Sequence, residues 1–302
     1  MLEMSYVQVS RGRFRGELSG FSLPSGMFWH SQANVGVTGE CGIPDGYLLV
    51  GLTTQEGDYW HDRPVTTGTM VIGNPSTGLC HRTGEFHGAW VWLLRQERYQ
   101  ELAESLGLNV VDFDRSRILF DVRPGPMSRL RELIRDFLSS DNPEFSASQI
   151  AWFEAALVRG TLQCLAKSEE RGRMIRSTGR GRLVARAARD LLHRNCQSPL
   201  SMAELSGRLK VPERTLRAYF SKHFQISPAS YHLCLRLNLV RRNLLLAVPE
   251  KGAVSRTATY FGFWHMGRFG QQYRAFFGEA PIETLRQETS FESWPGFELL
   301  IE

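Results

Sequence analysis

Two stretches near the C-terminal end carry side chains suited to recognising the edges of nucleic-acid bases. They contain Arg214, Arg217, Arg268, Gln271 and Gln272. A guanidinium donates two parallel hydrogen bonds to guanine O6 and N7, and a carboxamide pairs in a similar two-point manner with adenine N6 and N7. This chemistry works only if a rigid element projects these side chains together, so the elements that carry them come next.

An internal repeat supplies those elements. Leu216, Phe220, Phe224 and Pro228 recur 53 positions later as Phe269, Tyr273, Phe277 and Pro281. Upstream the offset is 52, which pairs Met202, Ser206 and Val211 with Val254, Ala258 and Phe263. The spacing of four predicts one apolar face on each of two helices, and a Pro begins the next helix each time. Each copy therefore has the form of a helix-turn-helix, whose second helix enters a major groove.

The polar face of each second helix becomes the candidate base-reading surface, because the aromatic residues are assigned to the core. Lys222 and Arg274 are expected to contact phosphates and so fix the register without reading sequence. The candidate DNA-binding residues are Arg214, Thr215, Arg217, Ala218, Ser221 and Lys222 in the first copy, and His265, Arg268, Gln271, Gln272 and Arg274 in the second.

The stretch "AVSRTATYFGFWHMGRFGQQYRAFFGEAP" resembles the signature of the AraC family of bacterial transcription regulators. The similarity covers roughly residues 182–287, and it implies two helix-turn-helix units joined by a long helix, here "PASYHLCLRLNLVRRNLLLA". It also implies a sequence-specific regulator, more often an activator. Its partners would be an operator in double-stranded DNA, a small-molecule effector and RNA polymerase. Lys210 departs from the family pattern, in which Gly is common at this turn.

The charge distribution agrees with a polyanion partner. Residues 182–290 hold 17 Lys/Arg against 7 Asp/Glu, whereas the chain as a whole is only +5. The polar, basic run 167–182 has little to bury and predicts a linker. An alternative function follows from the same features, namely nonspecific nucleic-acid binding through this linker with bases stacked on exposed aromatic rings.

The N-terminal half predicts a different architecture. Short apolar or β-branched runs such as "YLLVGLTT" alternate with turn clusters such as "GIPDG", which is typical of an antiparallel barrel or sandwich. By resemblance it is cupin-like. Segments 126–138 and 146–166 have helical periodicity, and their apolar stripes could cover the β structure or form a homodimer interface.

The expected fold is thus α+β with two domains. It comprises a regulatory domain at 1–166, the basic linker at 167–182, a DNA-binding domain at 183–290 and a tail at 291–302. Helices are expected in that DNA-binding domain at 183–194, 201–209, 213–224, 228–247, 255–261, 266–277 and 281–288.

The effector pocket is hard to locate from sequence. Aromatic residues that suit an apolar pocket suggest Trp60 and Trp90, with His30 or Arg95 supplying polarity. His61, Cys80, His81 and His87 raise a metal hypothesis, but no H-x-H box accompanies them, so no metal and no cofactor are expected. The sequence also lacks a P-loop, a G-x-S-x-G elbow and an H-E-x-x-H motif, which argues against an enzyme.

Composition excludes several other classes. With 42% hydrophobic and 22% charged residues, the chain is neither disordered nor fibrous. It has no signal-peptide pattern and no long apolar run, so we expect a cytoplasmic protein without a membrane partner. Its five cysteines follow no disulfide or metal spacing and are expected to be free, buried thiols.

Overall fold

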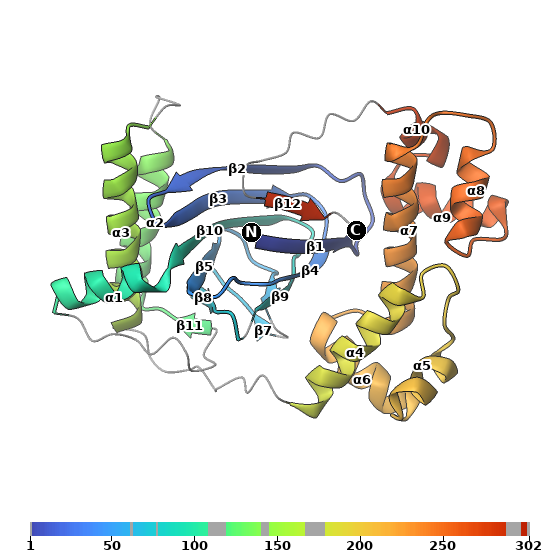
Figure 1. The fold of residues 1–302 in the computed structure, drawn as a ribbon, viewed down its shortest axis with the longest axis horizontal. Helices are drawn as coiled ribbons and strands as arrows, with labels where there is room; N and C mark the ends of the chain where they lie inside the picture. The colour runs from blue at the N-terminus through green and yellow to red at the C-terminus, as the bar shows by residue number, and fades with distance from the viewer. Residues whose placement is uncertain are drawn as a thin grey trace.

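The computed structural model describes residues 2–60, 63–76, 78–107, 119–139, 145–166, 179–287 and 297–300. They form a two-sheet β region and a helical region, which lie side by side (Figure 1). Most of the predicted linker, at 167–178, and most of the predicted tail lie outside the described residues. The expected α+β architecture is confirmed, while the finer cupin-like assignment stays a prediction.

The first sheet has the strand order β12-β1-β4-β9-β6-β7. Neighbouring strands are antiparallel except for β1 and β12, which run parallel. The C-terminal strand thus joins the sheet that the N-terminal strand begins. The strands are β1 (Leu2–Gln8), β4 (Val37–Cys41), β6 (Tyr59–Trp60), β7 (Arg63–Pro64), β9 (Leu79–Arg82) and β12 (Phe297–Leu300).

The second sheet is antiparallel, with the order β11-β8-β5-β10-β3-β2. Both its faces are covered, which explains why β5 and β10 are almost continuously apolar rather than alternating. The strands are β2 (Gly16–Leu23), β3 (Gly26–Ala33), β5 (Tyr47–Thr53), β8 (Thr69–Gly73), β10 (His87–Arg95) and β11 (Leu119–Asp121).

Three helices cover the outer face of that second sheet: α1 (Gln96–Ser105), α2 (Pro124–Leu138) and α3 (Ala147–Ala166). Leu130 and Ile134 of α2 and Phe153 of α3 are buried in one cluster with Trp92 of β10. The predicted apolar stripes therefore cover the β structure. The segments themselves begin two residues before and one residue after the expected positions 126 and 146.

The helical region closely follows the sequence-based expectation. It contains α4 (Arg180–Arg194), α5 (Met202–Leu209), α6 (Glu213–Phe224), α7 (Pro228–Leu246), α8 (Ala253–Tyr260), α9 (Met266–Phe277) and α10 (Pro281–Leu285). Helix α4 starts at Arg180, three residues before the boundary expected at 183. Local signals fix several ends: Ser201 and Glu204 form a capping box on α5, and Ser227 caps α7 ahead of Pro228.

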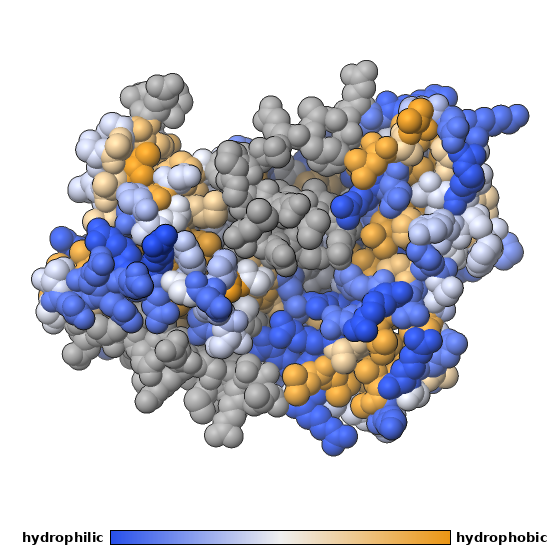
Figure 2. Space-filling view, in the orientation of Figure 1, coloured by the Kyte–Doolittle hydropathy of each residue, from blue (hydrophilic) through white to orange (hydrophobic). Residues whose placement is uncertain are grey.

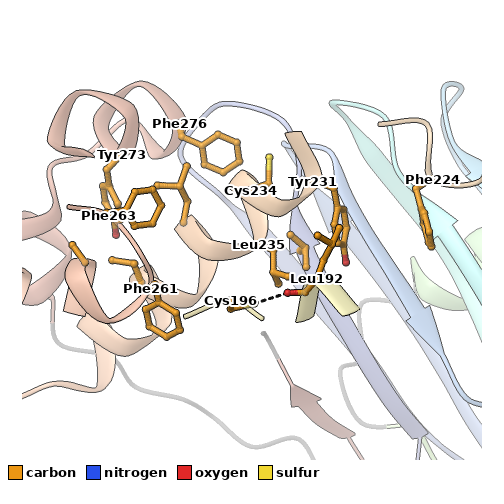
Figure 3. Close-up of a cluster of buried hydrophobic side chains, with 14 of the residues drawn as sticks. Leu192, Cys196, Phe224, Tyr231, Cys234, Leu235, Phe261, Phe263, Tyr273 and Phe276 are labelled. Atoms are coloured by element: carbon orange, nitrogen blue, oxygen red, sulfur yellow. Dashed lines mark hydrogen bonds between the residues drawn. The ribbon is translucent and has the colours of Figure 1, made fainter. Parts of the chain in front are cut away.

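The long helix α7 separates two small aromatic clusters. Figure 3 shows Leu235 between Tyr231 and Phe224 on one side and Phe261, Phe263 and Tyr273 on the other. All are buried in one continuous core. The pairs α5–α6 and α8–α9 are thus held to opposite parts of the same rigid helix.

Polar contacts join the helical region to the first sheet. Asn238 of α7 donates to the carbonyl of Gln8 (3.0 Å) and accepts from its amide (3.2 Å). Glu40 of β4 accepts hydrogen bonds from Arg186 of α4 (3.1 and 3.2 Å) and also pairs with Arg189. Although burial opposes ionisation, the two guanidinium groups hold the pKa of Glu40 down to about 2. These contacts position α4 and α7 against the β region.

Candidate nucleic-acid interface and the adjoining pocket

The second helix of each helix-turn-helix pair buries the face that the repeat predicted. Leu216, Phe220 and Phe224 of α6 are 0–2% exposed, and Phe269, Tyr273 and Phe277 of α9 are equally inaccessible. Tyr273 also donates a hydrogen bond to Thr284 Oγ1 at 2.9 Å. The aromatic residues at the repeated positions are core, as expected, and cannot stack on bases.

The opposite face of α6 points to solvent. Arg214, Arg217, Ala218 and Lys222 are exposed, while Thr215 and Ser221 are half-buried. Arg217 forms an ion pair with Glu213 one turn earlier, at 3.3 Å. Arg214 has no hydrogen-bond or ion-pair partner among the described residues, so its donors are available to a ligand. The predicted residues of the first copy are thus brought together on one surface, as a single helix requires.

The corresponding face of α9 carries the second set. His265, Arg268, Gln271 and Arg274 are exposed and Gln272 is half-buried. Within the described part of the chain Arg268 also has no polar partner. In Figure 2 the outer surface over α8 and α9, at the right, is predominantly hydrophilic. The structure therefore assembles both predicted sets, and their contact with DNA stays a prediction.

Two exposed aromatic residues beside α9 were not among the predicted site residues. Trp264, just before the helix, is 70% exposed, and Tyr260, at the end of α8, is 57% exposed. Neither belongs to the repeated positions, so the repeat gave no signal for them. Large exposed aromatic side chains are common at binding surfaces.

The four predicted effector residues do not line one cavity. Trp60 lies in the core between the two sheets and stacks on His81 with ring centroids 5.2 Å apart. Trp90 and His30 are register partners on the opposite face of the second sheet, on the side of the covering helices. Arg95 is exposed at the end of β10. Successive side chains of a strand point to opposite faces of its sheet. Which face each one occupies depends on strand pairing, and here it separates Trp60 from Trp90 and His30.

A cavity of about 280 Å³ lies instead between the two sheets and α7. Tyr6, Trp29 and Leu18 supply apolar walls, and Asn238 and Arg241 of α7 close one side. Arg241 is ion-paired with Glu279 at 3.1 Å. A ligand here would touch both the β region and the helix that connects the two helix-turn-helix pairs.

Ser31, His87 and Asp58 form a hydrogen-bonded chain at the edge of this cavity. His87 Nδ1 lies 2.8 Å from Asp58 Oδ2, and His87 Nε2 lies 3.3 Å from Ser31 Oγ. Asp58 is 1% exposed. Burial opposes its ionisation, but hydrogen bonds from His87 and from the Gly84 amide keep the pKa of Asp58 below its usual range. The sequence singled out His87 only as a possible metal ligand, and no motif connected it with Ser31 or Asp58.

One group of possible metal ligands is found among the described residues: the ligand atoms of Glu40, Cys80 and His223 lie within 4.8 Å of one another. Both carboxylate oxygens of Glu40 are already paired with arginines, whose charge repels a divalent cation. Of the earlier metal hypothesis, His61 lies outside the described residues, while His81 and His87 face aromatic and carboxylate neighbours. All five cysteines are free and buried, as predicted.

Comparison with known proteins identifies the helical region. Residues 205–287 match the family model described as a helix-turn-helix domain. The chain is 33% identical over 103 residues to a probable thc operon regulatory protein of Rhodococcus erythropolis, covering 34% of this chain and 31% of that protein. It is 32% identical over 93 residues to the XylDLEGF operon transcriptional activator 3 of Pseudomonas putida, covering 31% and 28%. The alignments thus span about a third of each relative.

Two solved structures are similar over more of the chain. The AraC-like transcriptional activator CuxR aligns over 74% of this chain and 80% of its own, with 15% identity and a TM-score of 0.39. ToxT from Vibrio cholerae O395 aligns over 94% and 96%, with 11% identity and a TM-score of 0.31. No helix in the described ranges is both long and apolar enough to span a membrane.

Proposed function

Because the C-terminal part of this chain is a helix-turn-helix domain of the AraC type, we propose that the protein is a sequence-specific DNA-binding regulator of transcription. The observation that carries this proposal is the pair of solvent-facing polar surfaces on the second helices of the two units, with Arg214 and Arg217 on α6 and Arg268 and Gln271 on α9. Both helices are fixed to the same connecting helix α7. They can therefore enter successive major-groove segments of one asymmetric site.

Within those surfaces the residues divide by role. Arg217 and Arg268 lie in the N-terminal halves of α6 and α9, the part of a recognition helix that contacts base edges. Lys222 and Arg274 lie further along, where they contact phosphates. Ala218 offers no bulk, so α6 can approach the groove closely. The Arg217–Glu213 ion pair opens on binding, since guanine offers the guanidinium two acceptors in its place.

The remaining parts of the proposal concern regulation. The 280 Å³ cavity is the effector site, since a ligand there contacts Asn238 and Arg241 of α7. Such a ligand would favour one position of α7, the helix that positions both α6 and α9. The relatives named as activators favour activation, with RNA polymerase as a further partner. A homodimer would form through the β region and its helices. The protein acts in the cytoplasm, where bacterial DNA lies.

A binding-site selection from random duplexes tests the DNA proposal. Arg217→Ala and Arg268→Ala should each relax base preference at particular positions and cost about 1–3 kcal/mol on the preferred site. Lys222→Ala should weaken binding to all sequences alike and lower its salt dependence. Arg129→Ala, an exposed residue on α2, is the matched control. If both Arg variants kept the wild-type preference, α6 and α9 would not read bases, and uniform weak binding would favour a nonspecific nucleic-acid-binding protein.

A further inference from the structure

The hydrogen-bonded chain Ser31–His87–Asp58 has the connectivity of a nucleophile, a general base and an orienting carboxylate. We propose that Ser31 is a nucleophile that small, neutral carboxylic esters acylate inside the cavity. The inference concerns covalent chemistry in the β region, so it holds or fails independently of DNA binding. Such a constellation is recognised by geometry and not by position along the chain.

The direction of the hydrogen bonds follows from the carboxylate. Ionised Asp58 can only accept, so His87 Nδ1–H must be the donor across the 2.8 Å contact. In the neutral imidazole Nε2 is then an acceptor, and the Ser31 hydroxyl donates to it at 3.3 Å. Asp58 is itself fixed, because its Oδ1 accepts from the Gly84 amide at 3.0 Å and its Oδ2 lies 3.1 Å from Thr53 Oγ1. The base is therefore held in the tautomer that activates a serine.

The Ser31–His87–Asp58 series differs from an ordinary buried polar network because a ligand in the cavity can reach it. His87 and Asp58 are 8% and 1% exposed, but Ser31 is half-buried and lines the cavity together with His87. One strand pairing and one connecting segment bring them together: Ser31 lies on β3, His87 on the neighbouring β10, and Asp58 in the segment before β6. The nucleophile and the base therefore both reach the space that a ligand would occupy, and Asp58 lies behind them.

The cavity wall selects the class of substrate. Leu18, Trp29 and Val37 give an apolar surface for an acyl chain. Arg241 is the cationic side chain of the described lining, and Glu279 already neutralises it at 3.1 Å. A free carboxylate therefore gains little here, whereas a neutral ester loses little solvation on entry. The volume of about 280 Å³ limits the ligand to a small one.

The reaction needs only the ester and water. Ser31 Oγ attacks the carbonyl carbon while its proton passes to His87 Nε2. The tetrahedral intermediate collapses, the C–O bond to the alcohol breaks, and the leaving oxygen takes that electron pair and the proton from His87. Ser31 is left as an acyl ester. Water then attacks the acyl carbon with His87 again as base, and release of the carboxylic acid returns the proton to Ser31 Oγ.

The test treats full-length protein with a biotinylated fluorophosphonate, which loses fluoride as Ser31 Oγ bonds to phosphorus, and separately with p-nitrophenyl butyrate. We expect one adduct per chain by intact mass, mapped to Ser31, and a burst of about one p-nitrophenolate per chain. Ser31→Ala should abolish both signals. Ser19→Ala, an exposed serine on the adjacent strand β2, is the matched control and should keep them. His87→Gln should slow labelling on the order of 100-fold or more.

Two further measurements keep the result decisive. Thermal denaturation checks that each variant folds, and Ser31→Cys retains a nucleophile at the same place, so its alkylation by iodoacetamide should be faster than that of the five native cysteines, which are buried. Absence of an adduct on the wild-type protein, or an adduct that persists unchanged in Ser31→Ala, would overturn the proposal. In that case the hydrogen bonds among Ser31, His87 and Asp58 would have a structural role only.

Discussion

Lys210 and Gly262 occupy the same position in the two helix-turn-helix turns, and both adopt left-handed backbone, with φ of 53° and 77°. The hydrogen bond after each turn is also the same. The amides of the next residues, Val211 and Phe263, donate to the carbonyls of Ser206 and Ala258 at 3.2 and 3.0 Å. The relation recurs at the end of each second helix, where Gln225 (55°) matches Gly278 (72°). The repeat is thus a repeat of backbone conformation, and the first copy adopts it without glycine.

Lys210→Gly should therefore stabilise the protein. A non-glycine residue in left-handed backbone costs about 1–2 kcal/mol, which the change to Gly removes. Gly also has more conformational freedom to lose on folding, so the net stabilisation is roughly 0.5–1 kcal/mol. Lys210 is exposed, so no packing is lost. Urea denaturation would measure the gain, and a loss of stability would show that the Lys side chain has a role beyond the turn.

Gly262→Ala should destabilise more than Gly278→Ala. Both positions have positive φ, but a Cβ at Gly262 would lie 2.8 Å from Pro199, whereas one at Gly278 would lie 3.5 Å or more from its neighbours. We expect about 1–2 kcal/mol for Gly278→Ala and a larger loss for Gly262→Ala. Equal losses in the free energy of unfolding would mean that Pro199 moves aside without cost.

Asn238→Ala should loosen the contact between α7 and β1. The side-chain amide replaces a neighbouring strand for Gln8, because it bonds both the carbonyl and the amide of that residue. Loss of two part-buried hydrogen bonds costs about 1–3 kcal/mol. Denaturation followed separately by fluorescence and far-UV circular dichroism should show transitions that move apart. Asn243→Ala, exposed on the same helix, should leave the transitions coincident.

Stability should fall as the pH is lowered from 6.5 towards 4. Burial lowers the pKa of His81, His223 and His232 to about 4, whereas the unfolded value is about 6.5. Within this window the unfolded chain binds protons that the folded chain does not, so each histidine removes about 1.4 kcal/mol per pH unit. Above pH 6.5 these groups contribute no slope.

Glu40 also contributes to the loss of stability in acid, but at lower pH than the histidines. Its pKa of about 2 means that the stability from its arginine contacts is complete above about pH 4.5 and is lost only as the pH falls towards 2. Urea denaturation at several pH values would separate the two effects. His232→Gln should reduce the slope between pH 6.5 and 4, and His265→Gln, on the exposed start of α9, should not. A flat profile over this window would contradict the burial assignment.

Sequence alone determined the helical region almost completely. Its signals are local, since the spacing of Leu216, Phe220 and Phe224 defines a helix face, Ser201 and Ser227 cap helices, and Pro228 and Pro281 begin them. Because each face is set within one helix, the exposure of Arg217 and Arg268 followed from the burial of their neighbours. The repeat further separated core aromatic residues from surface ones.

Only the tertiary structure decided which residues meet in the β region. Trp60 and Trp90 looked alike in sequence, yet Trp60 lies between the two sheets and Trp90 lies under the covering helices. The pairing of β3 with β10 likewise brings together Ser31 and His87, which are far apart along the chain. Register depends on long-range partners, and a shift of one residue would reverse every side chain. The junction of Gln8 with Asn238 likewise depends on how the two regions pack. Non-local contacts leave no periodic signal, whereas helices do.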